Sequence, residues 1–159
     1  MTKPRFNAVD AAIILLLAAV IAAAVWYFAS SADEPNVYVY FTVEFRNQPE
    51  GFEQHIIREI GGEARDSVRN YFLGHVYDVD VRPAHIISFD AISQTYVEGF
   101  IPERNDIFVT IRGRGVETNE SIHVEGNLVT IGRGMHIRGR GFVNSGFVVA
   151  LRTTTLNEE

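Results

Sequence analysis

The pattern of apolar and polar positions divides the chain into one long apolar run followed by short alternating segments. Residues 11–29 (AAIILLLAAVIAAAVWYFA) are apolar without interruption. At about 1.5 Å per residue, these 19 residues give a helix of about 28 Å, close to the ~30 Å hydrocarbon core of a bilayer. The pattern therefore predicts a transmembrane helix over 11–29.

Charges on either side of the run predict its orientation. Lys3 and Arg5 precede it, whereas Asp33 and Glu34 follow it. An excess of basic residues marks the cytoplasmic flank of a span. We therefore expect a single-pass protein of the inner (cytoplasmic) membrane, in which residues 1–10 are the cytoplasmic N-terminal flank.

A cleaved signal peptide is the alternative interpretation of the apolar run. Ser30-Ser31-Ala32 supplies small residues of the kind found at processing sites. The apolar region of a signal peptide usually spans about 7–15 residues, and this run is longer. Its length favours a retained anchor, followed by a polar linker over 30–36.

Residues 37–159 are expected to form an extracytoplasmic β-rich domain. Residues 37–45 (VYVYFTVEF) predict a strand buried on both faces, and residues 52–60 predict one short amphipathic helix that ends at Gly61-Gly62. Further strands are predicted over 74–81, 84–92, 96–101, 106–112, 135–137 and 146–152, with a turn at 144–146. A hairpin is predicted over 121–131, with its turn at Gly126-Asn127. The fold class is therefore mainly β, a small β-barrel or β-sandwich with one short helix.

Composition narrows the function. The chain has no cysteine, which excludes disulfides and thiol chemistry. With Lys3, Arg5 and Asp10 set aside, 19 acidic side chains face 12 arginines, a net charge of −7 that argues against nucleic acid as a partner. The spacing of histidines, serines and carboxylates matches no metal or nucleophile motif, so we expect no cofactor and no enzymatic activity.

Arginine is the one concentrated candidate for binding. The sequence IRGRG occurs at 111–115 and again at 137–141. Arginine makes bidentate contacts with phosphates and carboxylates, so this group predicts a contact with anionic lipid head groups or an acidic partner. The competing interpretation is structural, with glycines at bulges and arginines paired to nearby Glu117, Glu120 or Glu125. The candidate residues are Arg112, Arg114, Arg133, Arg138 and Arg140.

Small residues in the apolar run suggest a second kind of contact. Ala18 and Ala22, and likewise Ala19 and Ala23, are four residues apart. Such pairs allow two transmembrane helices to approach closely. They predict helix packing in a homo-oligomer or with a protein partner.

Several segments together resemble a known family. Residues 5–10 lead directly into the apolar run, and 106–151 contain VTIRGRGVET, VTIGRGMHIRG and a final GFVVAL. The middle contributes IGGEARDS, LGHV and Arg82-Pro83-Ala84. This order resembles a bacterial family of single-span proteins with an extracytoplasmic domain of unknown function. The resemblance implies an architecture and no catalytic residues.

A shorter likeness concerns Gly62 followed by Leu73-Gly74-His75-Val76. It is similar to mammalian-cell-entry (MCE) domains, small membrane-anchored β-barrels that form rings for lipid transport. Our leading expectation is a non-catalytic envelope protein that serves assembly or transport through protein–protein contacts. The alternatives are an MCE-like module that handles lipid or another ligand and, third, an envelope hydrolase.

Overall fold

The computed structural model describes residues 8–30 and 35–156, which fall into two compact units that divide after Glu34. The first unit contains helix α1 (Ala8–Ser30). This helix confirms the predicted one and begins three residues earlier, within the predicted flank 1–10. Residues 1–7 and linker residues 31–34 lie outside the described residues.

Helix α1 is apolar on all sides. The side chains of Leu15 and Trp26, near its two ends, are 71% and 75% exposed. A helix that is apolar all round and exposed requires an apolar environment. Its length and composition meet the requirements of a membrane span, and they equally meet those of a signal sequence.

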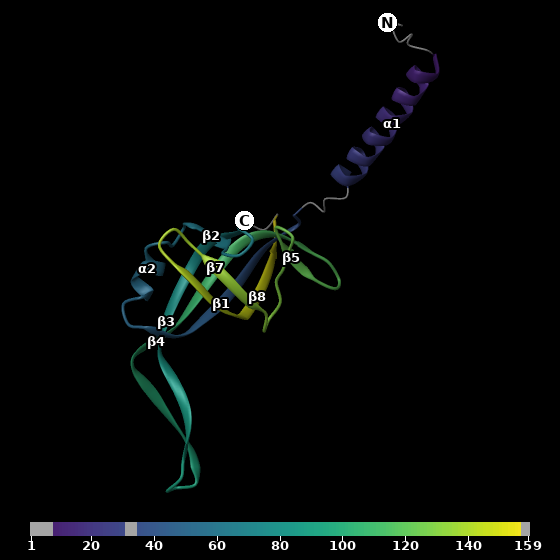
Figure 1. Ribbon diagram of the computed structural model, residues 1–159. Helices are drawn as coiled ribbons and strands as arrows, with labels where there is room; N and C mark the ends of the chain where they lie inside the picture. The colour runs from purple at the N-terminus through teal and green to yellow at the C-terminus, as the bar shows by residue number, and fades with distance from the viewer. Residues whose placement is uncertain (1–7, 31–34, 157–159) are drawn as a thin grey trace, which may run out of the picture. The chain divides into compact units, whose positions relative to one another are not determined.

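The second unit is an eight-stranded, fully antiparallel sheet with one short helix, α2 (Glu53–Ile57). The strands are β1 (Val37–Pro49), β2 (Glu63–Asp66), β3 (Phe72–Asp90), β4 (Thr95–Glu117), β5 (Ile122–Val124), β6 (Asn127–Leu128), β7 (Gly134–Arg138) and β8 (Val143–Thr155). This arrangement confirms the predicted mainly β fold with an N-terminal apolar helix and one further short helix (Figure 1).

The sheet closes on itself because β1 pairs on both of its edges. The strand order is β1-β8-β7-β2-β3-β4-β5-β6, and β1 also pairs with β4. Hydrogen bonding therefore runs round a circuit of six strands, with the β5–β6 hairpin added beyond β4. Closing a sheet in this way removes most of its open edges.

Alternation along β1 fills the interior of the circuit. Every second residue from Val37 to Phe45 is buried, and Val39, Phe41 and Val43 are fully enclosed. The outward residues Tyr38 and Tyr40 are partly exposed, so the prediction of a strand buried on both faces is only half correct. Ile56 of α2 joins the same core, which also includes Leu73, Ile107, Val109, Ile111 and Ile137.

Several predicted element boundaries were wrong. The predicted helix 52–60 is helical only over Glu53–Ile57. The predicted turn at 144–146 lies inside β8, and the chain instead turns before Val143. The predicted hairpin over 121–131 is confirmed, but its turn lies one residue earlier than Gly126-Asn127. Glu125 (φ 48°) and Gly126 (φ 77°) are the two left-handed turn residues, and Asn127 already pairs with Val124.

The largest difference concerns β3 and β4. The segments 74–81 and 84–92 were predicted as separate strands, as were 96–101 and 106–112. Each pair is one continuous strand, of 19 residues in β3 and 23 in β4. The last residues of β3 and the first residues of β4 project from the rest of the sheet as a two-stranded ribbon, drawn in teal in Figure 1.

The close approach of backbones at Gly113 gives a test of the first IRGRG segment. A Cβ atom at Gly113 would lie 2.3 Å from the carbonyl oxygen of Leu73. We expect Gly113→Ala to lower the free energy of unfolding by about 1–3 kcal/mol, because the two strands must separate. Urea unfolding of the full chain in mild detergent, followed by circular dichroism, measures this.

The matched control is Gly99→Ala, since a Cβ atom there meets nothing within 4 Å. Its effect should stay within about 0.5 kcal/mol. Equal stability of the Gly113→Ala protein and the original chain would contradict the structural role of this glycine.

Candidate interaction surface

The projecting ribbon, residues 85–100, is called the arm. Within it, β3 residues 85–90 pair with β4 residues 95–100, and residues 91–94 form the turn. The pairing of β1 with β4 ends at Pro49 opposite Arg104, before the arm begins. In the described part of the chain, no third strand pairs with either edge of the arm. Both edges therefore offer free backbone donors and acceptors to a partner.

The arm exposes seven large apolar side chains. Their exposed fractions range from 46% for Val97 to 96% for Ile92 at the tip. The complete set is Ile86, Ile87, Phe89, Ile92, Tyr96, Val97 and Phe100. A contiguous apolar surface of this kind on a folded protein marks an interaction site.

Alternation sorts these side chains onto two faces. Cross-strand partners share a face, so the pairs His85–Phe100, Ile87–Glu98 and Phe89–Tyr96 project together. We call this side the aromatic face. The rings of Phe89 and Tyr96 meet edge to face with centroids 5.4 Å apart. The opposite face is less apolar because Ser88, Asp90 and Thr95 lie on it.

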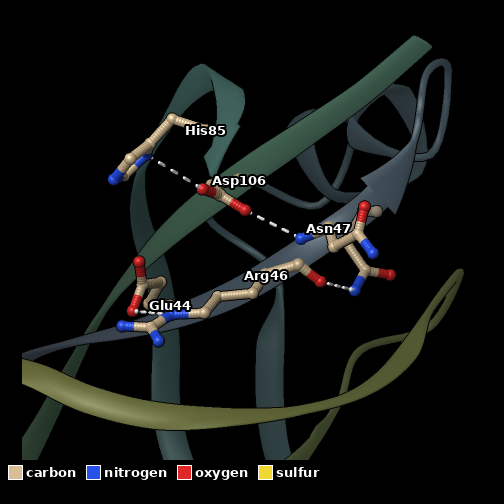
Figure 2. Close-up of polar contacts among 6 residues, drawn as sticks. Glu44, Arg46, Asn47, His85 and Asp106 are labelled. Atoms are coloured by element: carbon tan, nitrogen blue, oxygen red, sulfur yellow. Dashed lines mark hydrogen bonds and ion pairs between the residues drawn. The ribbon is translucent and has the colours of Figure 1, made fainter. Parts of the chain in front are cut away.

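Polar contacts centred on the buried Asp106 connect the base of the arm to β1 (Figure 2). Asp106 is only 6% exposed, and its Oδ1 accepts a hydrogen bond from the backbone N–H of Asn47 at 2.7 Å. Its Oδ2 lies 3.7 Å from Nδ1 of His85, the first residue of the arm. Beside it, Nε of Arg46 donates to Oε2 of Glu44 at 2.8 Å. Asp106 thus links the end of β1 to both strands at the base of the arm.

The strands are irregular at this base. Between the pairs Pro83–Asn105 and His85–Phe100, β3 contributes one residue and β4 contributes four. Asn47 and Glu103 both adopt positive φ, near 55°, although neither is glycine. The backbone N–H of Glu50 donates to the carbonyl oxygen of Glu103 at 3.1 Å. Bulges of this type bend a strand and redirect the segment that follows.

Asp90 fixes the turn at the tip. Its Oδ2 accepts a hydrogen bond from the Ser93 hydroxyl at 2.7 Å, and its Oδ1 accepts one from the backbone N–H of Ile92 at 3.0 Å. The Ser93 bond first, and the Ile92 bond second, hold the pKa of the Asp90 carboxyl below its ordinary value. The carboxylate form therefore stabilises the turn that presents Ile92.

The structure distributes the five predicted arginines over different elements. Arg112 and Arg114 lie on β4, and the guanidinium of Arg112 stacks 4.6 Å from the centre of the Tyr38 ring. Arg133 precedes β7, Arg138 ends β7, and Arg140 lies in the turn that follows. Strands β4 and β7 are not neighbours in the sheet, so the two IRGRG segments do not form one surface patch along the strand order.

Two of these arginines do lie together. Arg138 and Arg140 line a hollow of about 560 Å³, which Arg65, Glu59 and Glu63 also line. Nη2 of Arg138 donates to Oδ1 of Asn70 at 2.7 Å. Arg65 pairs with Glu63 at 2.8 Å, so the two carboxylates offset part, but not all, of the positive charge of the three arginines. The contact with an anionic ligand stays a prediction.

The predicted alanines lie on α1 as expected for a helix. Ala18, Ala19, Ala22 and Ala23 are all exposed. Helix packing through them stays a prediction. Within residues 8–30 and 35–156, no group of three or more His, Asp or Glu side chains is placed to hold a metal ion.

Sequence reasoning missed the arm. The segments 84–92 and 96–101 were predicted as strands, and nothing in that prediction distinguished them from the other strands of the sheet. The signal that could have revealed the arm is that apolar and polar residues do not alternate in the two segments that flank the turn, 86–89 and 96–101. Apolar residues on both faces of a hairpin require cover on both faces.

Together, the fold and the exposed arm define a mainly β protein with an N-terminal apolar helix and an apolar surface for contact. The model of one family, described as a domain of unknown function (DUF4330), matches residues 3–152. The chain therefore belongs to the DUF4330 family. No significant similarity to a curated protein or to a solved structure is found.

The turn at the tip generates a prediction for pH. Because the pKa of Asp90 in the folded chain lies below the ordinary value of 3.8, the carboxylate's stabilisation is present above that value and is lost as pH falls through the lowered pKa. A carboxyl titration followed by NMR should give a midpoint below 3.8 for Asp90. The amide chemical shift of Ile92, whose N–H donates to Asp90, should change with pH at the same midpoint. Asp90→Asn keeps an acceptor but has no titrating group, so it should remove this pH-dependent change. A midpoint at or above the ordinary value would contradict the turn geometry.

Proposed function

We propose that this DUF4330 protein is a non-catalytic, membrane-anchored envelope protein that serves assembly or transport by binding protein partners through its arm. The proposal places α1 in the inner membrane as a retained anchor, with the β-rich unit on the extracytoplasmic side. The single observation that carries it is the arm, which exposes seven large apolar side chains on a ribbon without neighbouring strands.

The physical support is that a two-stranded ribbon is marginal in water. An isolated hairpin needs further strands or a covering surface before it becomes independently stable. The arm has two open edges, and its aromatic face is exposed. A protein partner can satisfy both needs, by adding a strand to an edge and by covering the apolar side chains.

The same edges argue against insertion of the arm into lipid. Unpaired backbone groups are not tolerated in the hydrocarbon region of a bilayer. Asp90 and Glu98 would also need to lose their hydration. A protein surface is therefore the better cover.

The MCE-like alternative receives less support from the packing of a single copy. Side chains such as Phe41, Phe45 and Ile111 fill the interior of the closed circuit and are fully enclosed. A lipid path through one copy would require that space. Handling of lipid would have to use surfaces outside this core.

The test is the size of the protein in its own membranes. We expect the full chain, extracted in mild detergent from cells that produce it, to migrate as a complex larger than one chain. Phe89→Ser combined with Tyr96→Ser should shift it to the mass of a single chain, because both side chains are exposed and belong to the aromatic face.

The matched control replaces two exposed apolar residues away from the arm, Val68→Ser with Ile131→Ser. This pair should leave the complex intact. A complex that survives the arm substitutions, or a chain that is single before any substitution, would refute the proposed function.

A further inference from the structure

The aromatic face of the arm suggests which partner covers it. Its four apolar side chains are Ile87, Phe89, Tyr96 and Phe100, with exposed fractions of 64%, 54%, 75% and 72%. At roughly 150–250 Å² for a fully exposed large side chain, these fractions amount to about 400–660 Å² per copy. We propose, on the basis of the proposed function, that the aromatic face packs against the same face of a second copy of this chain.

The area fits an interface between two equal partners. Two such faces would together bury about 800–1,300 Å², which reaches the lower end, about 1,200 Å², of the range for stable, specific interfaces. In a two-fold interface the same patch serves both partners, so it must be compatible with itself. Rings and aliphatic side chains meet this condition, because aromatic pairs prefer offset or edge-to-face contacts that two identical patches can form.

Charge on the face is also compatible with self-contact. Glu98 is its only carboxylate, and His85 lies at the base beside Asp106. Ile87 is the direct cross-strand neighbour of Glu98, and both lie midway along the arm. A partner of opposite charge would instead require a strongly charged patch, which this face lacks.

Anchoring strengthens a contact of this modest area. Copies held in one membrane by α1 share a plane, which raises their effective concentration relative to free solution. A small interface that would be weak between free chains can then be occupied. The two open edges of the arm stay available for additional strand pairing.

The absence of cysteine from the chain allows a direct test with single cysteines. Glu98→Cys places a thiol on the aromatic face, whereas Ser88→Cys places one on the opposite face of the same arm. Asn119→Cys is an exposed control outside the arm. The purified full chain, reconstituted in phosphatidylcholine vesicles without other proteins, is treated with a short bifunctional maleimide.

We expect Glu98→Cys to give cross-linked pairs of chains in several-fold higher yield than Ser88→Cys or Asn119→Cys. Adding Phe89→Ser and Tyr96→Ser to Glu98→Cys should reduce that yield to the level of the controls. Equal yields at Glu98 and Ser88, or no excess at Glu98, would overturn the proposed pairing.

The outcomes separate this inference from the proposed function. One outcome is that Glu98→Cys fails to cross-link while Phe89→Ser with Tyr96→Ser still shifts the complex from cells to the mass of a single chain. In that case the arm binds a different protein, and only the self-pairing is wrong. If a fluorophore on Ile92→Cys is instead quenched by brominated lipid, the arm contacts the bilayer, and both proposals fail.

Discussion

The pairing of β1 on both edges is the constraint on which the rest of the structure depends. One side of this strand bonds to β8 and the other to β4, so it closes the circuit that encloses the core. It also decides where the arm begins, because β1 ends at Pro49 and the turn at Gly51 redirects the chain into α2. Beyond that point, β3 and β4 pair with each other and with no other strand among the residues that the structure describes. The same strand therefore explains a closed core and an open ribbon.

The base of the arm is where these two regions meet. Asp106, which is buried, bonds to the backbone of Asn47 and approaches His85. A buried carboxylate needs such partners, since an unpaired buried charge is costly. Cross-strand bulges and two left-handed residues, Asn47 and Glu103, concentrate irregular backbone at this one place. Local irregularity of this kind is characteristic of functional junctions, where it sets the direction of a projecting element.

The sequence predicted most helices and strands, but it did not predict which strands lie next to each other in the sheet. Apolar length was sufficient to predict α1, and the hairpin over 121–131 was predicted with its turn one residue too late. Periodicity states which side chains share a face, but it does not state which strands pair. Ile86 and Phe89 lie in the predicted strand 84–92, and periodicity did not indicate that they are more than half exposed. Pro83 misled for a different reason, because a proline normally interrupts a strand and here it sits next to a bulge inside β3. The arginines were predicted as a binding group because they are concentrated in the sequence. In the structure, the two IRGRG segments lie on β4 and at the end of β7, which are not adjacent strands.

A projecting contact surface suits a domain with this charge. The chain beyond the apolar run carries a net charge of −7, so close approach of two such bodies is opposed by repulsion. Screening limits that repulsion to a Debye length of about 8–10 Å at physiological salt. At about 3.4 Å per residue, the six residues 85–90 extend the arm by about 20 Å, which exceeds the screening distance. In the proposed pairing, two copies can therefore join their apolar arms while their acidic bodies stay separated.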